Sequence, residues 1–183
     1  MRLVVFARLH SANDWGKCLE IGAETRAVDI SDIVFRDCHV IHATGSVLDV
    51  LNVDYAVIHD VLYENIDVEY DDVMEEPLIQ KRDNEIYVNR NPEYTPNLLD
   101  CWITYIHEYS AVGKGRGITR DISFKNIRLT GKHGVNVRFE GYDEQHLCSN
   151  ITVENIYWNG TKVEVLPKDC FTINQYCENI QWK

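Results

Sequence analysis

The segment SDIVFRDC, residues 31–38, decides the fold because its pattern recurs along the chain. The recurrences are HDVLYENI (59–66), RDISFKNI (120–127), SNITVENI (149–156) and the shorter ENIQW (178–182). The Asp or Asn before the first aliphatic residue of each copy falls at positions 32, 60, 121, 150 and 179, giving steps of 28, 61, 29 and 29 residues. A constant period of this length indicates stacked supersecondary units. The long step predicts a degenerate copy in the middle, with DNEIYVN (83–89) as its sequence.

Each copy alternates apolar residues with polar or mixed ones, which is the period of a β-strand. In the first copy Ile33 and Phe35 point to one side, and Val61 and Tyr63 take the same positions in the second. These residue types are the ones that strands prefer. No segment shows a capped amphipathic helix.

The copies end in an Asp or Asn that we expect at a left-handed corner, because these residues tolerate that backbone conformation. The corner residues are Asp37, Asn65, Asn126 and Asn155. Stacked in successive units, their side chains can form a ladder of hydrogen bonds. The recurring segment is therefore predicted to be structural, a strand, a corner and a second short strand.

A loop then leads to a third strand in each unit. The candidates are CLEIG (18–22), SVLDV (46–50), PLIQK (77–81), VNVRFE (135–140) and CFTIN (170–174). A leucine-rich repeat needs a leucine pattern that is missing here, and a propeller blade needs about 40 residues or more. We therefore predict an all-β fold: a right-handed parallel β-helix, or solenoid, with about six rungs of roughly 29 residues. It forms a single domain over residues 1–183 that lacks N-terminal rungs.

The net charge of the 183 residues is −11, which argues against a nucleic-acid partner because phosphate binding needs clustered Lys and Arg. No stretch approaches the length of a membrane span, so no membrane partner is expected. The opening MRLVVFARLH lacks the layout of a signal peptide. The localisation stays unknown: the chain as given would be cytoplasmic, and it would be secreted or periplasmic if it was excised from a longer precursor.

The six cysteines form no CxxC pair, which argues against a zinc knuckle or a thioredoxin-like site. Cys38 takes the place that isoleucine holds in the other copies, so we interpret it as a small buried hydrophobic residue. A disulfide stays open. EYDDVMEEP (69–77) has carboxylates for Ca²⁺ but no EF-hand spacing, and a solvated loop is favoured. No metal and no cofactor are expected.

Three stretches resemble the later rungs of polygalacturonase-like, pectin-lyase-fold glycosidases (glycoside hydrolase family 28-like). They are DWGKCLEIGAET with VDISDIVFRDCHVIH (14–25 and 28–42), GRGITRDISFKNIRLTG (115–131) and NITVENIYWNG (150–160). The resemblance runs from Val4 to Trp182. It implies the parallel β-helix and an activity on carbohydrate.

The motifs that carry catalysis in that family have no counterpart here. Its Asn-Thr-Asp motif and its adjacent Asp pair would precede residue 1, its Arg-Ile-Lys motif is absent, and Gly16-Lys17-Cys18 stands where Gly-His-Gly would. Its catalytic residues are therefore not carried over. Either the catalytic half is missing or other carboxylates act.

Glu20 and Asp49 are the candidate catalytic residues. If Leu19 and Leu48 face inward, strand alternation turns both carboxylates outward. Adjacent rungs are about 4.8 Å apart, so the two would stand side by side. Glycoside hydrolysis needs such a pair, one acid and one base or nucleophile. The alternative is that both are solvated positions on an acidic protein.

Further residues near this face are candidates for binding the substrate, although packing or solvation explains each of them as well. They are Trp15, Lys17, Glu24, Asp54, Asn136, Arg138, Tyr142, Asp143 and His146. Trp15 and Trp102 are aromatics of the kind that stack on sugar rings. The segment VNRNPEYTPNLLD (88–100) breaks the period, and we expect it to leave the solenoid as a loop.

Three functions remain open. The first is a glycoside hydrolase, or part of one, that acts on a polysaccharide or oligosaccharide of plant or microbial origin. The second is a glycan-binding β-helix module without turnover, and the third is an oligomeric structural β-helix. LVVFARLH (3–10) would leave an apolar solenoid end exposed, which favours a homo-oligomer through that end. Carbohydrate is the expected partner, and whether the chain is an enzyme stays open.

Overall fold

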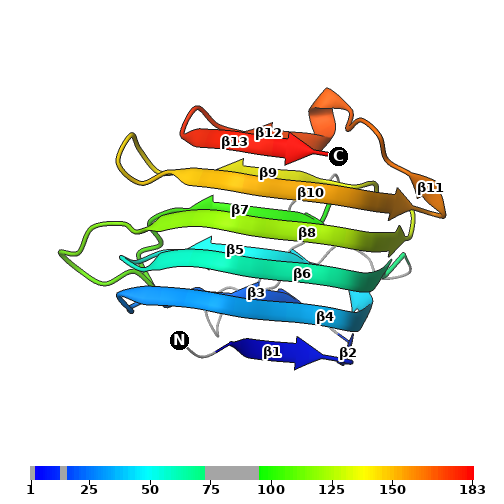
Figure 1. Ribbon diagram of the computed structural model, residues 1–183, viewed down its shortest axis with the longest axis horizontal. Helices are drawn as coiled ribbons and strands as arrows, with labels where there is room; N and C mark the ends of the chain where they lie inside the picture. Colours follow the sequence, from blue (N-terminus) through cyan, green and yellow to red (C-terminus); the bar gives the residue numbers. More distant parts are fainter. Residues whose placement is uncertain (1–2, 13–15, 73–94) are drawn as a thin grey trace, which may run out of the picture.

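The computed structural model describes residues 3–12, 16–72 and 95–183, which form an almost wholly β structure with parallel sheets (Figure 1). Within these ranges there is no α-helix, and the one helical turn is the 3₁₀ segment η1 (Lys168–Cys170). The part of the chain described here contains no helix with the length and apolarity that crossing a membrane requires. The all-β prediction is confirmed.

The first sheet has eight strands, and its main path runs β1-β4-β6-β8-β10-β11, with β2 beside β4 and β13 beside β10. The strands are β1 (Val4–Ala7), β2 (His10–Ala12), β4 (Asp29–Ala43), β6 (Val57–Tyr70), β8 (Ile118–Thr130), β10 (Cys148–Trp158), β11 (Thr161–Lys162) and β13 (Cys177–Trp182). Every pair is parallel except β10 with β11.

The second sheet has five parallel strands in the order β12-β9-β7-β5-β3. They are β3 (Leu19–Ile21), β5 (Leu48–Asn52), β7 (Leu99–Ile103), β9 (Val137–Glu140) and β12 (Phe171–Ile173). Figure 1 shows this sheet behind the first, with strands of the two sheets alternating along the chain. The core lies between the sheets, where the apolar sides of the alternating strands meet.

The recurring segments lie side by side in register. Ile33 pairs with Val61, Val61 with Ile122, Ile122 with Ile151, and Ile151 with Ile180. Cys38 is buried at the position that isoleucine takes in the other copies, as predicted. A column of aromatic rings runs through the core from Phe6 through Phe35 and Tyr63 to Phe124, with ring centroids 4.9, 4.9 and 5.1 Å apart.

Among the described residues, no further strand of this sheet lies between the copies at 59–66 and 120–127. The prediction that the 61-residue step holds a degenerate copy forming its own layer is therefore wrong. β6 and β8 pair with each other directly, with His59 opposite Arg120. Residues 83–89 and 77–81 lie outside the described residues. The strand that pairs with β5 on the side away from β3 is β7 (Leu99–Ile103). The extra length of this step is an insertion between two adjacent layers.

The predicted corner ladder is confirmed. Asp37, Asn65, Asn126 and Asn155 all have φ of 54–55°. Asn65 donates to Asp37 (3.2 Å), Asn126 to Asn65 (3.0 Å) and Asn155 to Asn126 (3.1 Å). The side-chain amides thus tie four successive strands together along one edge, where Asn satisfies both the backbone conformation and the neighbouring strand.

A second ladder, which the sequence analysis did not predict, runs along the residues that open each copy. Asp32, Asp60, Asp121, Asn150 and Asn179 have φ between 52° and 57°. Asn150 donates to Asp121 (2.9 Å) and Asn179 donates to Asn150 (2.8 Å). Each of the first four copies therefore bends the chain twice, five residues apart.

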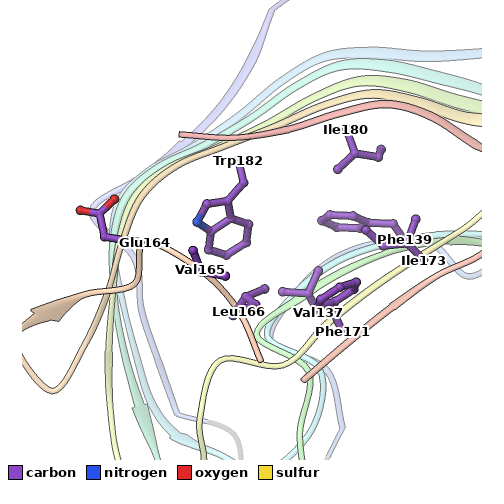
Figure 2. A pocket seen from close by; sticks show the side chains of 9 residues that line it. All are labelled: Val137, Phe139, Glu164, Val165, Leu166, Phe171, Ile173, Ile180 and Trp182. Carbon is purple, nitrogen blue, oxygen red and sulfur yellow. The ribbon is translucent and has the colours of Figure 1, made fainter. Parts of the chain in front are cut away.

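Apolar side chains are accessible at both ends of the stack. In β1, Val4, Val5 and Phe6 are each 41% exposed. At the other end a cavity of about 350 Å³ opens between the two sheets (Figure 2). Its lining is apolar apart from Glu164 at the rim and includes Phe139, Ile180 and Trp182.

Candidate functional site

A row of polar side chains crosses the five-stranded sheet. Register partners place Glu20 beside Asp49, Asp49 beside Asp100, Asp100 beside Arg138, and Arg138 beside Thr172. The residues that flank Glu20, Asp49, Asp100 and Arg138 along their strands belong to the core, as Leu48 and Val50 do around Asp49, whereas those that flank Thr172 are exposed. Because side chains alternate along a strand, the row lies on the outer side of the sheet.

Glu20 and Asp49 are register neighbours, as the sequence predicted, and both bind the same ammonium group. Lys17 Nζ contacts Glu20 Oε1 at 2.9 Å and forms an ion pair with Asp49 Oδ2. The two carboxylates differ in exposure. The Glu20 side chain is 27% exposed, but that of Asp49 is 0% exposed, so Asp49 is not the open surface residue that alternation alone suggests. Lys17 lies over it.

The environment of Asp49 changes its acidity. Burial, assisted by the neighbouring Asp100 charge, raises the pKa of Asp49 to about 7 against the opposing pull of Lys17. Burial works against the charge of Lys17 as well, but its contacts with Asp49 and Glu20 leave the pKa of Lys17 raised. Asp49 Oδ1 is buried and has no hydrogen-bond partner in the described part of the chain. The carboxyl group is thus poised to hold a proton near neutral pH.

Asp100 is the member of the row that the sequence analysis missed. Its carboxylate is fully buried and accepts bonds from Arg138 Nε (2.7 Å) and Nη2 (2.6 Å), Ser46 Oγ (2.9 Å) and Asn97 Nδ2 (3.1 Å). Burial disfavours the charged form of Arg138, but the hydrogen bonds and the charge of Asp100 outweigh burial and raise the pKa of Arg138. The sequence does contain a pattern that could have identified Asp100, because Leu99-Asp100 repeats the Leu48-Asp49 pair of the previous strand.

Trp102 lies next to this row and carries two cations on its ring. The Arg138 guanidinium lies 3.6 Å from the ring centroid, and Lys17 Nζ lies 5.7 Å from it. The half-buried indole and the half-buried guanidinium form a flat platform beside the acidic pair. The predicted binding residues Lys17 and Arg138 are therefore brought together with Glu20 and Asp49.

Three other predicted binding residues lie in loops with separate contacts. Asp54 is fully buried, and its carboxylate accepts the Ala111 N–H (2.6 Å) and pairs with Arg26 (3.4 Å). Asn136 donates to the carbonyls of Pro96 (3.3 Å) and Gly134 (3.4 Å), contacts within and between loops. Glu24 is exposed in the loop after β3. Trp15 lies outside the described residues.

Tyr142, Asp143 and His146 form a turn of their own after β9. His146 Nδ1 lies 2.7 Å from Asp143 Oδ1, and the rings of Tyr142 and His146 are 6.3 Å apart. The Gln145 N–H bond and the His146 side chain lower the pKa of Asp143. No hydrogen bond or ion pair among the described residues joins this turn to the row across the sheet.

The arrangement offers one proton-holding carboxyl group, a second and more accessible carboxylate, and a cationic and aromatic platform on one face. A scan of protein-family models and searches of curated proteins and of solved structures found no match to this chain.

Proposed function

We propose that the chain is a right-handed parallel β-helix of about six rungs, each turn passing once through both sheets. The support is the register of the strands, because residues 28 or 29 positions apart pair repeatedly in the first sheet, as Ile151 does with Ile180, and at the start of the second, as Leu19 does with Leu48. In such a helix the outer face of the second sheet is a continuous wall. The row from Glu20 to Thr172 then crosses five successive rungs.

We further propose that this wall cleaves glycosidic bonds, which makes the protein a carbohydrate-active glycoside hydrolase or part of one. The observation that carries the proposal is that Asp49 is fully buried beside the more accessible Glu20, an arrangement that raises the pKa of Asp49 to about 7. Glycosidases need one carboxylic acid that keeps its proton near neutral pH and a second carboxylate as base or nucleophile. The resemblance to polygalacturonase-like β-helices points to the same substrate class.

The contacts support one division of roles within this proposal. Asp49 is the general acid, because burial favours its protonated form, and Glu20 is the nucleophile or base, because it is accessible. Both carboxylates contact one nitrogen, Lys17 Nζ, so the contacting oxygens lie within about 6 Å of each other. That is closer to the spacing of retaining enzymes than of inverting ones. A retained anomeric configuration is the expected outcome.

Substrate reaches Asp49 in this proposal when the Lys17 side chain moves aside. Lysine has a long flexible stem, and its side chain is 24% exposed. The platform of Trp102 and Arg138 supplies the contacts for a sugar ring, since aromatic faces pack on apolar sugar faces and guanidinium groups bond hydroxyl or carboxylate oxygens.

The test is the release of reducing ends from a panel of polysaccharides and oligosaccharides. The wild-type protein cleaves at least one, whereas Glu20→Gln and Asp49→Asn each lower the rate by about 10²–10⁴-fold. Glu178→Gln is the matched control, because it changes an exposed carboxylate on β13, in the other sheet. No turnover on any substrate, or equal rates in all three variants, would contradict the hydrolase.

A glycan-binding module without turnover is the second candidate. Asp49 and Asp100 are fully buried and paired with Lys17 and Arg138, which leaves the platform as the accessible feature. Saturable binding on a glycan array without product, abolished by Trp102→Ala, would favour this function.

An oligomeric structural role is the third candidate, and the exposed apolar residues of β1 favour it. An exposed strand edge of this kind is a template for pairing with the edge of another chain. A stable oligomer without affinity for any sugar, measured by light scattering and glycan array, would favour this role over the other two.

A further inference from the structure

Two cysteines lie side by side on neighbouring strands at the end of the stack that holds the cavity. Cys148 of β10 and Cys177 of β13 are register partners in a parallel pair. Both side chains face the core, where Cys148 belongs to the buried cluster and Cys177 packs against it. Cys148 and Cys177 are both free thiols.

The spacing of this pair suits a disulfide. Register partners in adjacent strands lie about 4.8 Å apart, within the usual Cα separation of bonded cysteines, about 4.4–6.8 Å. Their Cβ atoms need a small approach. β13 can supply it, because among the described strands it pairs only with β10.

The two thiols differ in a way that suits sequential chemistry. Cys148 is fully buried, whereas Cys177 is half-buried. Cys177 Sγ lies 3.1 Å from the Phe139 carbonyl oxygen and 3.5 Å from Asn174 Oδ1. Its contact with Cys148 lowers the pKa of Cys177, and the same contact together with burial raises the pKa of Cys148. The accessible thiol is therefore the more readily ionised one, and thiolates are the attacking species in disulfide exchange.

We infer that Cys148 and Cys177 form a thiol–disulfide pair that responds to small-molecule disulfides, with Cys177 as the attacking and Cys148 as the resolving cysteine. The Cys177 thiolate attacks one sulfur of a disulfide such as oxidised glutathione, forms a mixed disulfide and releases one glutathione thiolate. Cys148 gives its proton to solvent and attacks the Cys177 sulfur, which releases the second glutathione. The two protein thiols lose two electrons and two protons, and the glutathione disulfide is reduced to two thiols.

The bond would fasten the strand that carries part of the cavity wall. Ile180 and Trp182 of β13 line the cavity (Figure 2), and Trp182 Nε1 also donates to the Val163 carbonyl (3.1 Å). A covalent link from Cys177 to β10 holds this wall in place, so the oxidised protein resists loss of β13. The other cysteine near the pair is Cys101, whose carbonyl oxygen lies 3.7 Å from Cys148 Sγ.

The experiment titrates the folded protein with oxidised glutathione, traps free thiols with an alkylating reagent and maps the peptides by mass spectrometry. The wild-type protein yields a linked peptide that contains Cys148 and Cys177 and loses the mass of two hydrogens. Cys148→Ser stops at a glutathione adduct on Cys177, and Cys177→Ser forms neither product at position 148. Cys170→Ser, at another half-buried cysteine near this end, behaves as the wild type.

Stability gives a second readout. Oxidation raises the midpoint of thermal unfolding of the wild-type protein by roughly 5–10 °C, because the bond closes a loop of about 30 residues, and leaves Cys177→Ser unchanged. A persistent glutathione adduct on wild-type Cys177, or a link from Cys148 to Cys101 instead, would overturn the inference. The wild-type mapping needs no variant to fold and no glycan, so it is independent of the proposed function.

Discussion

Replacing Arg138 with methionine tests whether the row across the second sheet is held together by its buried charges. The Asp100 carboxylate is fully buried and takes two of its four bonds from Arg138, at 2.7 and 2.6 Å. In Arg138→Met, Oδ1 loses Nε and Oδ2 loses Nη2, and only Oδ2 keeps other donors, Ser46 and Asn97. The variant therefore buries a carboxylate that is only half satisfied.

The size of the effect follows from those contacts. Removing one partner of a buried ion pair costs about 3–5 kcal/mol, and the two remaining donors reduce this by about 1 kcal/mol each. The lost stacking of Arg138 on Trp102, at 3.6 Å, adds about 1 kcal/mol. We expect Arg138→Met to lower the free energy of unfolding by about 3 kcal/mol, or the midpoint of thermal unfolding by about 6–12 °C.

The assay is urea denaturation at pH 7, followed by circular dichroism, for the wild type, Arg138→Met, Asp100→Asn and the double variant. Asp100→Asn removes the unpaired charge, so the double variant is more stable than Arg138→Met. The cycle should give a coupling energy of about 2 kcal/mol. A loss below about 1 kcal/mol for Arg138→Met, or a coupling energy near zero, would refute the reasoning.

Three further predictions concern the ladder, the acidic pair and the core. Asn126→Ala loses two ladder bonds and places alanine at a φ of 54°, so it should lower the free energy of unfolding by about 2–3 kcal/mol. Asn126→Gly loses the same bonds but glycine accepts this φ, so the loss should be about 1–2 kcal/mol. Equal losses of the two variants in thermal denaturation would count against the left-handed corner. The folded protein keeps the Asp49 proton up to a pKa of about 7. As the pH rises from about 4 to 7, the free energy of unfolding of the wild type should therefore fall relative to that of Asp49→Asn, by at most about 1.4 kcal/mol per pH unit. Parallel curves of unfolding free energy against pH would contradict this. Tyr63→Phe removes the hydroxyl that donates to the carbonyls of Asp49 (3.0 Å) and Leu19 (3.3 Å), so urea denaturation should show a loss of about 1–2 kcal/mol, and an unchanged midpoint would contradict these bonds.

The stacking of the layers could be predicted from the sequence because one short pattern fixes three things at once. Alternation sets which side chains face the core, the Asn or Asp sets the bend, and the period sets the neighbour. Ile122 and Asn126 illustrate this, since each lies beside the residue of the next copy and keeps its predicted role.

The long step and the missed Asp100 have a common cause. An insertion between two stacked parallel strands leaves those strands in contact, so a doubled spacing in sequence does not require a further strand between them. β6 and β8 pair across it, and β7 pairs with β5 where the strand at 77–81 was expected. Because the third strand was predicted at 77–81, residues 88–100 were predicted to form a loop, and Asp100 was not considered as a site residue.

The burial of Asp49 could not be predicted from alternation. A strand pattern tells which side of a sheet a residue faces, but not what lies over that side. Lys17, in the segment before β3, closes over Asp49 through a contact between residues 32 positions apart. The raised pKa of Asp49 follows from that cover, and so was not accessible from the sequence.

The acidity of Asp49 is the central claim, and titrating its carboxyl carbon by ¹³C NMR tests it most directly. Protein labelled at the aspartate carboxyl carbon is followed from pH 3 to 9, and Asp49→Asn identifies the resonance by its disappearance. We predict a midpoint near pH 7, with burial and Asp100 as the cause. A midpoint near the ordinary aspartate value of about 3.9 would contradict the assignment of Asp49 as the acid.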